Sequence, residues 1–207
     1  GLHWKWSIPF LFKIVLRISF HWGFNENSKT LLLAHQIYIH IVSYESLFLG
    51  MQITLIAIGK TDRAELEELI SVYAKRLQHY IKFEFRIIPD IRNSKNLSEA
   101  QQKEKEGELI LAQLQPTDTL VLLDEKGKQY TSVEFADFLQ KKMNSGIKTL
   151  VLVIGGPYGF SEAVYSKCSG KISLSKMTFS HQMVRLFLIE QVYRGFTILR
   201  NEPYHHQ

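Results

Sequence analysis

Short apolar runs alternate with longer helical patterns along the chain from Met51 onward. The runs are rich in β-branched and aromatic side chains, as β-strands are. They cover residues 52–58, 82–89, 119–123, 148–154 and 171–174. The other stretches begin at capping residues or place apolar positions three to four residues apart, which is typical of helices. They cover residues 61–80, 98–115, 132–144, 161–168 and 181–199.

This alternation predicts an α/β fold in which helices cover both faces of a parallel sheet, because parallel strands need crossover connections that lie over the sheet. Local signals set the expected boundaries. Ser98, Ser132 and Ser161 are predicted helix caps, and Pro116 ends the second helix. The polar segment 124–128 is predicted to be a turn that follows the third strand.

The fourth strand runs directly into a loop that contains Gly155, Gly156, Pro157 and Gly159. Ligands of open α/β sheets lie at the carboxyl ends of strands, so this loop predicts a small-molecule site built largely from backbone. A dinucleotide is disfavoured, because its fingerprint is G-x-G-x-x-G after the first strand. No Walker sequence is present either. We therefore expect a phosphate-free cofactor held by main-chain groups.

The last helix, residues 181–199, is apolar around most of its circumference. A helix of this kind needs burial on more than one side. Packing on the sheet covers one side, and a second subunit is the expected cover for the other. The alternative is a central core helix in a monomer.

The composition of the chain limits its expected cellular location, metal binding and partners. The chain has 207 residues, 45% of them hydrophobic, and a single cysteine, so no internal disulfide can form and a reducing, cytoplasmic location is expected. No metal-ligand spacing is present. The net charge of +5 is consistent with an anionic partner such as RNA.

Residues 1–50 differ from the rest of the chain in amino-acid composition. They are predicted to be an extension outside the functional domain, which would span residues 51–207. Within them, segment 8–24 is apolar but carries Lys13, Arg17 and His21, which makes it too short and too charged for a membrane span. An amphipathic helix on a membrane surface is the alternative for this segment. No membrane partner is expected for the domain.

Three motifs of the domain resemble those of the ribosomal RNA large-subunit methyltransferase H family. They are VLLDEKGKQYTSVEFA from Val121, LVIGGPYGFS from Leu152, and the C-terminal run from Ile172 to His206. The resemblance implies a SPOUT-class fold with a C-terminal trefoil knot and S-adenosylmethionine as cofactor. It also implies a homodimer that methylates N3 of a pseudouridine in a hairpin loop of large-subunit rRNA, within the assembled ribosome. A catalytically inactive ribosome- or RNA-binding module with the same fold is the alternative.

The resemblance also implies which residues form the site. Cofactor contacts fall on Leu123, Gly155, Leu174, Ser175, Lys176, Met177, Thr178 and Phe179. The candidate catalytic residues are Arg194, Tyr204 and His205. Arg194 would hold phosphate or a developing anion, although an ion pair with Glu190 is its simpler interpretation. Tyr204 would stack on a base and His205 would relay a proton, unless the tail is a frayed terminus.

The chain departs from the family pattern at two positions. Ser180 stands where proline is frequent, and it is an acceptable helix cap. His206 stands where a basic residue is usual, which weakens a phosphate-binding role there. His181 and Arg185 match the family and are expected at the rim that faces the RNA, with a purely structural role as the alternative for His181. Lys126 and Lys128 would add to this RNA surface.

Overall fold

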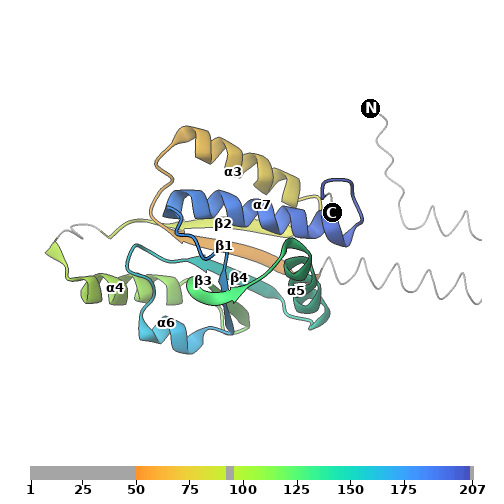
Figure 1. Ribbon diagram of the computed structural model, residues 1–207. Helices are drawn as coiled ribbons and strands as arrows, with labels where there is room; N and C mark the ends of the chain where they lie inside the picture. The colour runs from red at the N-terminus through yellow and green to blue at the C-terminus, as the bar shows by residue number, and fades with distance from the viewer. Residues whose placement is uncertain (1–49, 92–95, 206–207) are drawn as a thin grey trace, which may run out of the picture. The chain divides into compact units, whose positions relative to one another are not determined.

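The structure is a computed structural model that describes residues 50–91 and 96–205, and strands alternate with helices throughout (Figure 1). The strands are β1 (Gln52–Ile58), β2 (Lys82–Ile88), β3 (Asp118–Gln129), β4 (Thr149–Ile154) and β5 (Gly170–Ser173). The helices are α3 (Ala64–Leu77), α4 (Glu99–Leu111), α5 (Ser132–Asn144), α6 (Glu162–Lys167) and α7 (His181–Leu199). All pairings in the five-stranded sheet are parallel, in the order β2-β1-β4-β3-β5.

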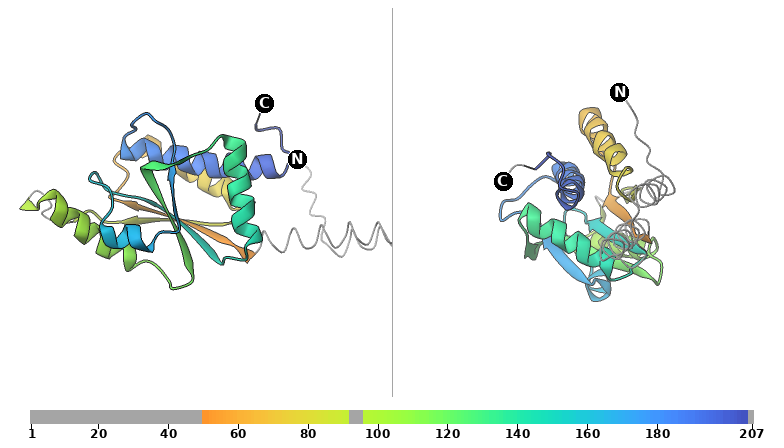
Figure 2. Two further views of the ribbon diagram at one scale, coloured as in Figure 1. Left: turned by 60° about the horizontal axis from the view of Figure 1, so that its bottom comes forward. Right: turned by 90° about the vertical axis from the view of Figure 1, so that its right-hand side faces the viewer.

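Helices cover both faces of this sheet, as predicted, with α3, α5 and α7 on one side and α4 and α6 on the other (Figures 1 and 2). Side chains alternate between the faces along β4. Leu150 and Leu152 enter the core beneath α3, α5 and α7, while Val151 and Val153 pack towards α4 and α6. All four are at most 2% exposed, which explains why the run is continuously apolar.

Of the predicted helix caps, the one at the start of α4 is confirmed and the one at the start of α5 is wrong. Ser98 caps α4, where its side chain accepts from the Gln101 N–H and the Gln101 side chain accepts from the Ser98 N–H. At α5 the cap is Thr131, not Ser132. A capping box needs Glu or Gln three residues beyond the cap, and Glu134 meets this condition only for Thr131.

The predicted turn at 124–128 is wrong, because β3 continues through it to Gln129. The short edge strand β5 pairs with β3 in two registers, since Ile172 faces Leu123 and also Lys128. The irregular stretch between these two partners absorbs the polar residues that suggested a turn. Gly127 makes this possible, because a Cβ there would lie 2.4 Å from the main-chain carbon of Ile172.

The predicted N-terminal extension covers residues 1–50, of which residues 1–49, including segment 8–24, lie outside the described residues. Among the residues that the structure does describe, no helix is long and apolar enough to cross a membrane.

We expect Gly127→Ala to lower the free energy of unfolding by about 1–3 kcal/mol, because the added methyl group must push β5 away from β3. Gly170→Ala, in β5 itself, is the matched control, because a Cβ there meets no atom within 4 Å. Urea denaturation at one protein concentration measures both. Equal stability of the two variants would contradict the close β3–β5 approach.

Candidate functional site

Three predicted cofactor residues come together on adjacent strands: Gly155 follows the carboxyl end of β4 and Leu174 that of β5, whereas Leu123 lies within β3, which continues to Gln129. Leu123 of β3 faces Ile154 on one side and Ile172 on the other. Gly155 follows Ile154 directly, and Leu174 comes two residues after Ile172. The three residues therefore lie at one edge of the sheet, on adjacent strands. Their role in cofactor binding stays a prediction.

In the loop after β4, neighbouring side chains pack closely against Gly155 and Gly156, where a Cβ would otherwise lie. A Cβ at Gly155 would lie 3.0 Å from the Phe160 ring, and one at Gly156 would lie 2.2 Å from Glu106 Oε2. Gly156 and Gly159 form an antiparallel bridge, in which the Gly159 N–H donates to the Gly156 carbonyl at 3.2 Å. Gly159 has φ +80°, a conformation that favours glycine. These contacts leave room for main chain but not for side chains.

Segment 174–179 links β5 to α7 and holds the remaining predicted cofactor contacts. Ser175 organises it, since its carbonyl accepts from Ser173 Oγ at 2.9 Å and its Oγ accepts from the Met177 N–H at 3.0 Å. Met177 is 73% exposed, whereas the Phe179 ring meets Phe187 edge-on at 5.2 Å. The segment is thus anchored at both ends and open to solvent at Lys176, Met177 and Thr178.

Arg185 is not at a rim, contrary to the prediction. It is 1% exposed, and its guanidinium donates to the Ile58 carbonyl at 2.6 Å and to Thr61 Oγ1 at 3.1 Å. Burial lowers the pKa of this guanidinium, while the charges of Asp62 and Asp90 oppose that shift. Sequence patterning cannot separate a buried arginine from an exposed one on an apolar helix. Arg185 therefore fastens the last helix to the end of the first strand.

His181, at the start of α7, does lie beside the candidate site. Its ring makes a hydrogen bond with the Gly155 backbone, which raises the pKa of the imidazole. Desolvation of the ring, followed by repulsion from Arg185, outweighs this contact, so the net pKa is lowered. His181 is therefore mainly neutral at pH 7.

The candidate catalytic residues Arg194 and Tyr204 form a cluster with Glu190. Arg194 donates to Glu190 Oε1 from Nε at 3.0 Å and from Nη2 at 2.5 Å. The Tyr204 hydroxyl donates to the same oxygen at 3.1 Å and lies 3.2 Å from the hydroxyl of Tyr73. The Arg194 guanidinium also covers the Tyr204 ring at 4.7 Å. The expected ion pair of Arg194 is thus present, and it is shared with the tail.

The described part of the tail is folded back on α7 and α3. The Glu202 N–H donates to the Thr197 carbonyl at 2.9 Å, and the Tyr80 hydroxyl donates to the Glu202 carboxylate. Asn201 turns the chain with φ 53°, a conformation that asparagine tolerates. His205 Nδ1 is buried and has no hydrogen-bond partner among the described residues. As far as His205, the tail is therefore packed against the domain and is not a frayed end.

Within one chain, the two groups of predicted site residues lie at opposite ends of α7. His181 contacts Gly155 at the start of the helix, whereas Arg194 lies 13 residues further along it. At 1.5 Å per residue this separates them by about 20 Å along the helix axis. Within the described tail, residues 200–205, Tyr204 returns to Glu190 and Arg194 at this end of the helix.

Two side chains near these groups were missed by sequence reasoning. Tyr73 lies within the helix predicted over residues 61–80 and was given no functional role, although its hydroxyl reaches the tail. Glu106 lies in a helix rich in charged residues, yet it is only 3% exposed and contacts the glycine loop. Its signal in the sequence is the neighbouring Gly107, because a glycine within a helix often marks a close approach.

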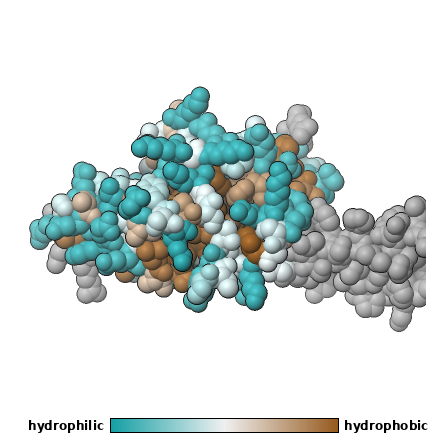
Figure 3. All heavy atoms as spheres, turned by 90° about the horizontal axis from the view of Figure 1, so that it is seen from below, coloured by the Kyte–Doolittle hydropathy of each residue, from teal (hydrophilic) through white to brown (hydrophobic). Residues whose placement is uncertain are grey.

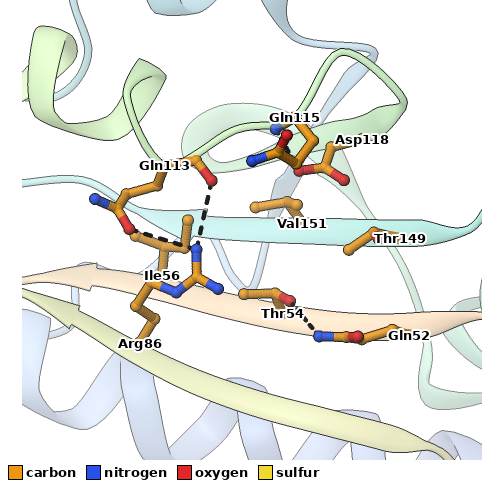
Figure 4. A pocket seen from close by; sticks show the side chains of 9 residues that line it. All are labelled: Gln52, Thr54, Ile56, Arg86, Gln113, Gln115, Asp118, Thr149 and Val151. Atoms are coloured by element: carbon orange, nitrogen blue, oxygen red, sulfur yellow. Dashed lines mark hydrogen bonds between the residues drawn. The ribbon is translucent and has the colours of Figure 1, made fainter.

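A polar cavity of about 210 Å³ lies elsewhere, near the amino ends of β1 and β4 (Figure 4). Its residues are Gln52, Thr54, Ile56, Arg86, Gln113, Gln115, Asp118, Thr149 and Val151. Arg86 closes one wall by donating to the carbonyl and the side chain of Gln113, both at 3.4 Å. On the same side of the sheet, hydrophilic residues cover the outer end of α4 and hydrophobic ones gather nearer the middle (Figure 3). The cavity contains none of the predicted site residues.

Across the described ranges, no group of His, Cys, Asp or Glu side chains has an arrangement that suits a metal ion.

Comparison with known proteins gives consistent matches to the domain. The family model described as "Predicted SPOUT methyltransferase" matches residues 51–205. The chain is 73% identical to the ribosomal RNA large subunit methyltransferase H of Flavobacterium johnsoniae over 157 residues, which are 76% of this chain and all of that protein. Over the same coverage it is 66% identical to the protein of that name from Christiangramia forsetii and 55% identical to the one from Porphyromonas gingivalis.

We expect Arg185→Met to lower the free energy of unfolding by about 1–3 kcal/mol, because it removes the donor to the buried Ile58 carbonyl. Arg63→Met is the control, because the Arg63 ion pair with Glu65 is highly exposed and such pairs contribute about 0–1 kcal/mol. Urea denaturation compares the two. If both variants retain wild-type stability, Arg185 does not fasten α7 to β1.

Proposed function

The chain belongs to the SPOUT methyltransferase family, and from this premise we propose that it transfers a methyl group from S-adenosylmethionine to large-subunit ribosomal RNA. The observation that carries the proposal is the meeting of Leu123, Gly155 and Leu174 at one sheet edge. The names of the relatives give the RNA class. N3 of a pseudouridine in a hairpin loop is the target that the family resemblance implies.

The residues at this edge fit such a cofactor. A Cβ at Gly155 would press on the Phe160 ring and one at Gly156 would collide with the Glu106 carboxyl group, so the loop presents main-chain groups at the end of β4. Segment 174–179 adds exposed main chain and the apolar Met177 side chain. A ligand with an adenine ring, hydroxyl groups and no phosphate suits these neutral contacts.

Bound S-adenosylmethionine supplies an already activated methyl group, so this chain needs to position the acceptor nitrogen and remove its proton. Holding two reactants in the productive geometry supplies about 7–11 kcal/mol of barrier reduction. Pyrimidine N3 is protonated at neutral pH, and a group that accepts its proton adds roughly 10²–10⁴-fold.

Arg194, Tyr204 and His205 would divide two tasks between them, which are to position the acceptor base and to remove its proton. Burial, the hydrogen bond with Tyr73 and the charge of Glu190 raise the pKa of the Tyr204 phenol. Tyr204 is therefore neutral at pH 7, and it acts by stacking and by donating a hydrogen bond. His205 would accept the proton from N3, because its buried Nδ1 has no partner among the described residues. Arg194 keeps its positive charge beside Glu190 and stabilises the anionic base.

A homodimer brings the two groups of site residues together. The separation of about 20 Å along α7 prevents one subunit from placing Arg194 over its own glycine loop. An antiparallel second copy of α7 would place its tail beside the first subunit's loop, and a two-fold axis repeats this arrangement. Exposed apolar side chains near the start of α7, Met177 and Phe187, support this interface.

Three further proposals follow from the family. The segment between β5 and α7 threads through a loop of the chain as a trefoil knot. The protein works in the cytoplasm, where ribosomes are assembled. Residues 1–50 form an extension that the reaction does not need, since the relatives match the chain over 157 residues.

The direct test of function is transfer of labelled methyl groups. We expect the full chain to bind S-adenosylmethionine and to label large-subunit rRNA in ribosomes from cells that lack the gene. Ribosomes that already carry the methyl group are the control and should take up no label. Cofactor binding without transfer to any ribosomal substrate would point to the inactive RNA-binding module instead.

Mixing two inactive variants tests the shared site. Gly155→Val blocks the cofactor loop and Arg194→Ala removes a tail residue, so we expect each homodimer to be inactive. After random exchange, half the dimers are mixed, and each mixed dimer has one intact site, which gives about a quarter of wild-type activity. Methyl transfer by the equimolar mixture measures this.

Circular dichroism first establishes that both variants are folded. A mixture no more active than its components, after exchange is verified, would show that each site belongs to one subunit.

A further inference from the structure

Glu106 of α4 is a buried acid with one unused oxygen. The residue is 3% exposed, although acidic side chains are almost never buried without a partner. Its Oε1 accepts a hydrogen bond from Gln102 Nε2 at 2.8 Å, one helical turn earlier. Its Oε2 is buried and has no partner among the described residues. An unsatisfied polar atom of this kind is costly, so its position calls for an explanation.

The unused oxygen lies against the glycine loop. A Cβ at Gly156 would be 2.2 Å from Glu106 Oε2 and 2.7 Å from the carboxyl carbon. The carboxyl group therefore packs directly on the Gly156 backbone. Gly155, the adjacent residue, is a predicted cofactor contact of the proposed methyltransferase.

A second contact fixes α4 on the same loop. A Cβ at Gly107 would lie 2.2 Å from Ser161 Oγ, and Ser161 ends the loop at the start of α6. Ser161 Oγ is also buried without a partner among the described residues. Two consecutive residues of α4, Glu106 and Gly107, thus hold the two ends of segment 156–161. The segment between them is the turn that Gly159 makes.

The surroundings of Glu106 favour its neutral form. Burial raises the pKa of the carboxyl, the hydrogen bond from Gln102 opposes this, and the negative charge of Asp90 raises the pKa further. Asp90, from the segment after β2, is the charged group that acts on Glu106 within the described chain. Gln102 and Ser161 face it with neutral groups. A neutral acid packs on Gly156 without placing a charge in this buried position.

We propose that Glu106 is a positioning residue, whose buried carboxyl group packs on Gly156 and holds the Gly155 main chain in place for the methyl donor. This inference rests on the proposed function. Glu106 acts through the loop and does not touch the reacting atoms. Ionisation would place an unpaired negative charge beside Asp90 and push the carboxylate away from the loop, which would release Gly155.

Cofactor affinity, measured by calorimetry with S-adenosylmethionine and the full chain, tests this role. At a pH below the folded pKa of Glu106 we expect Glu106→Gln to bind as the wild type does, because glutamine keeps the shape and the neutral state of the protonated acid. Glu106→Ala should bind about tenfold more weakly. Glu108→Gln, on the exposed side of the same helix, is the control and should change nothing. Wild-type affinity in Glu106→Ala would overturn the proposal.

The pH dependence separates positioning by a neutral acid from simple packing. An acid whose pKa is raised on folding makes the folded state progressively less stable as pH rises from its unfolded pKa to its folded pKa. We therefore expect both stability and cofactor affinity of the wild type to fall across this window relative to Glu106→Gln. Parallel pH profiles for the two proteins would show that Glu106 does not act through its neutral form.

A complementing pair tests the contact itself. Gly156→Ala should weaken cofactor binding by about tenfold, because its methyl group collides with the Glu106 carboxyl. Adding Glu106→Ala removes the collision and should restore part of the affinity, whereas two independent losses would multiply. If the wild type binds no S-adenosylmethionine, the proposed function fails, while the pH–stability difference between wild type and Glu106→Gln still reports on the neutral contact.

Discussion

Parallel pairing of β4 with β1 and β3 is the constraint on which the rest of the molecule depends. The three strands run in register, so that Ala57 and Leu123 lie on either side of Ile154, the last residue of β4. Because β4 is buried on both faces, slipping it by one residue would exchange its two sets of core side chains. This fixes where the chain leaves the sheet, and the glycine loop begins at that point.

The long apolar helix α7 connects two chemically different regions. At its start, Arg185 and His181 contact the end of β1 and the glycine loop. Towards its end, Glu190 holds both Arg194 and Tyr204. A rigid helix fixes the distance between these two regions, so one subunit cannot bring them together. The proposed dimer would therefore do more than cover an apolar surface, because it would complete the site.

Much of this arrangement could be predicted from the sequence, because it depends on local signals. The apolar runs predicted each strand of the described residues, and the bounds of α7 were predicted to the residue. The Ser98 cap and the glycine loop were also identified correctly. The failures came from interactions between distant segments. The extension of β3 depends on pairing with β5, and the burial of Arg185 depends on the Ile58 carbonyl. The burial of Glu106 depends on Gly156, which lies 50 residues later in the chain.

The bond between Arg185 and Ile58 also constrains the order of events during synthesis. It joins residues 127 positions apart, so the first strand leaves the ribosome long before its buried carbonyl has a donor. Strand β1 likewise waits for β4 before it is enclosed on that side. Distant pairings of this kind slow folding and leave hydrophobic surface open in the meantime. The nascent chain must therefore remain unaggregated until α7 has been synthesised, and a truncated product that ends before α7 would retain an unfinished core.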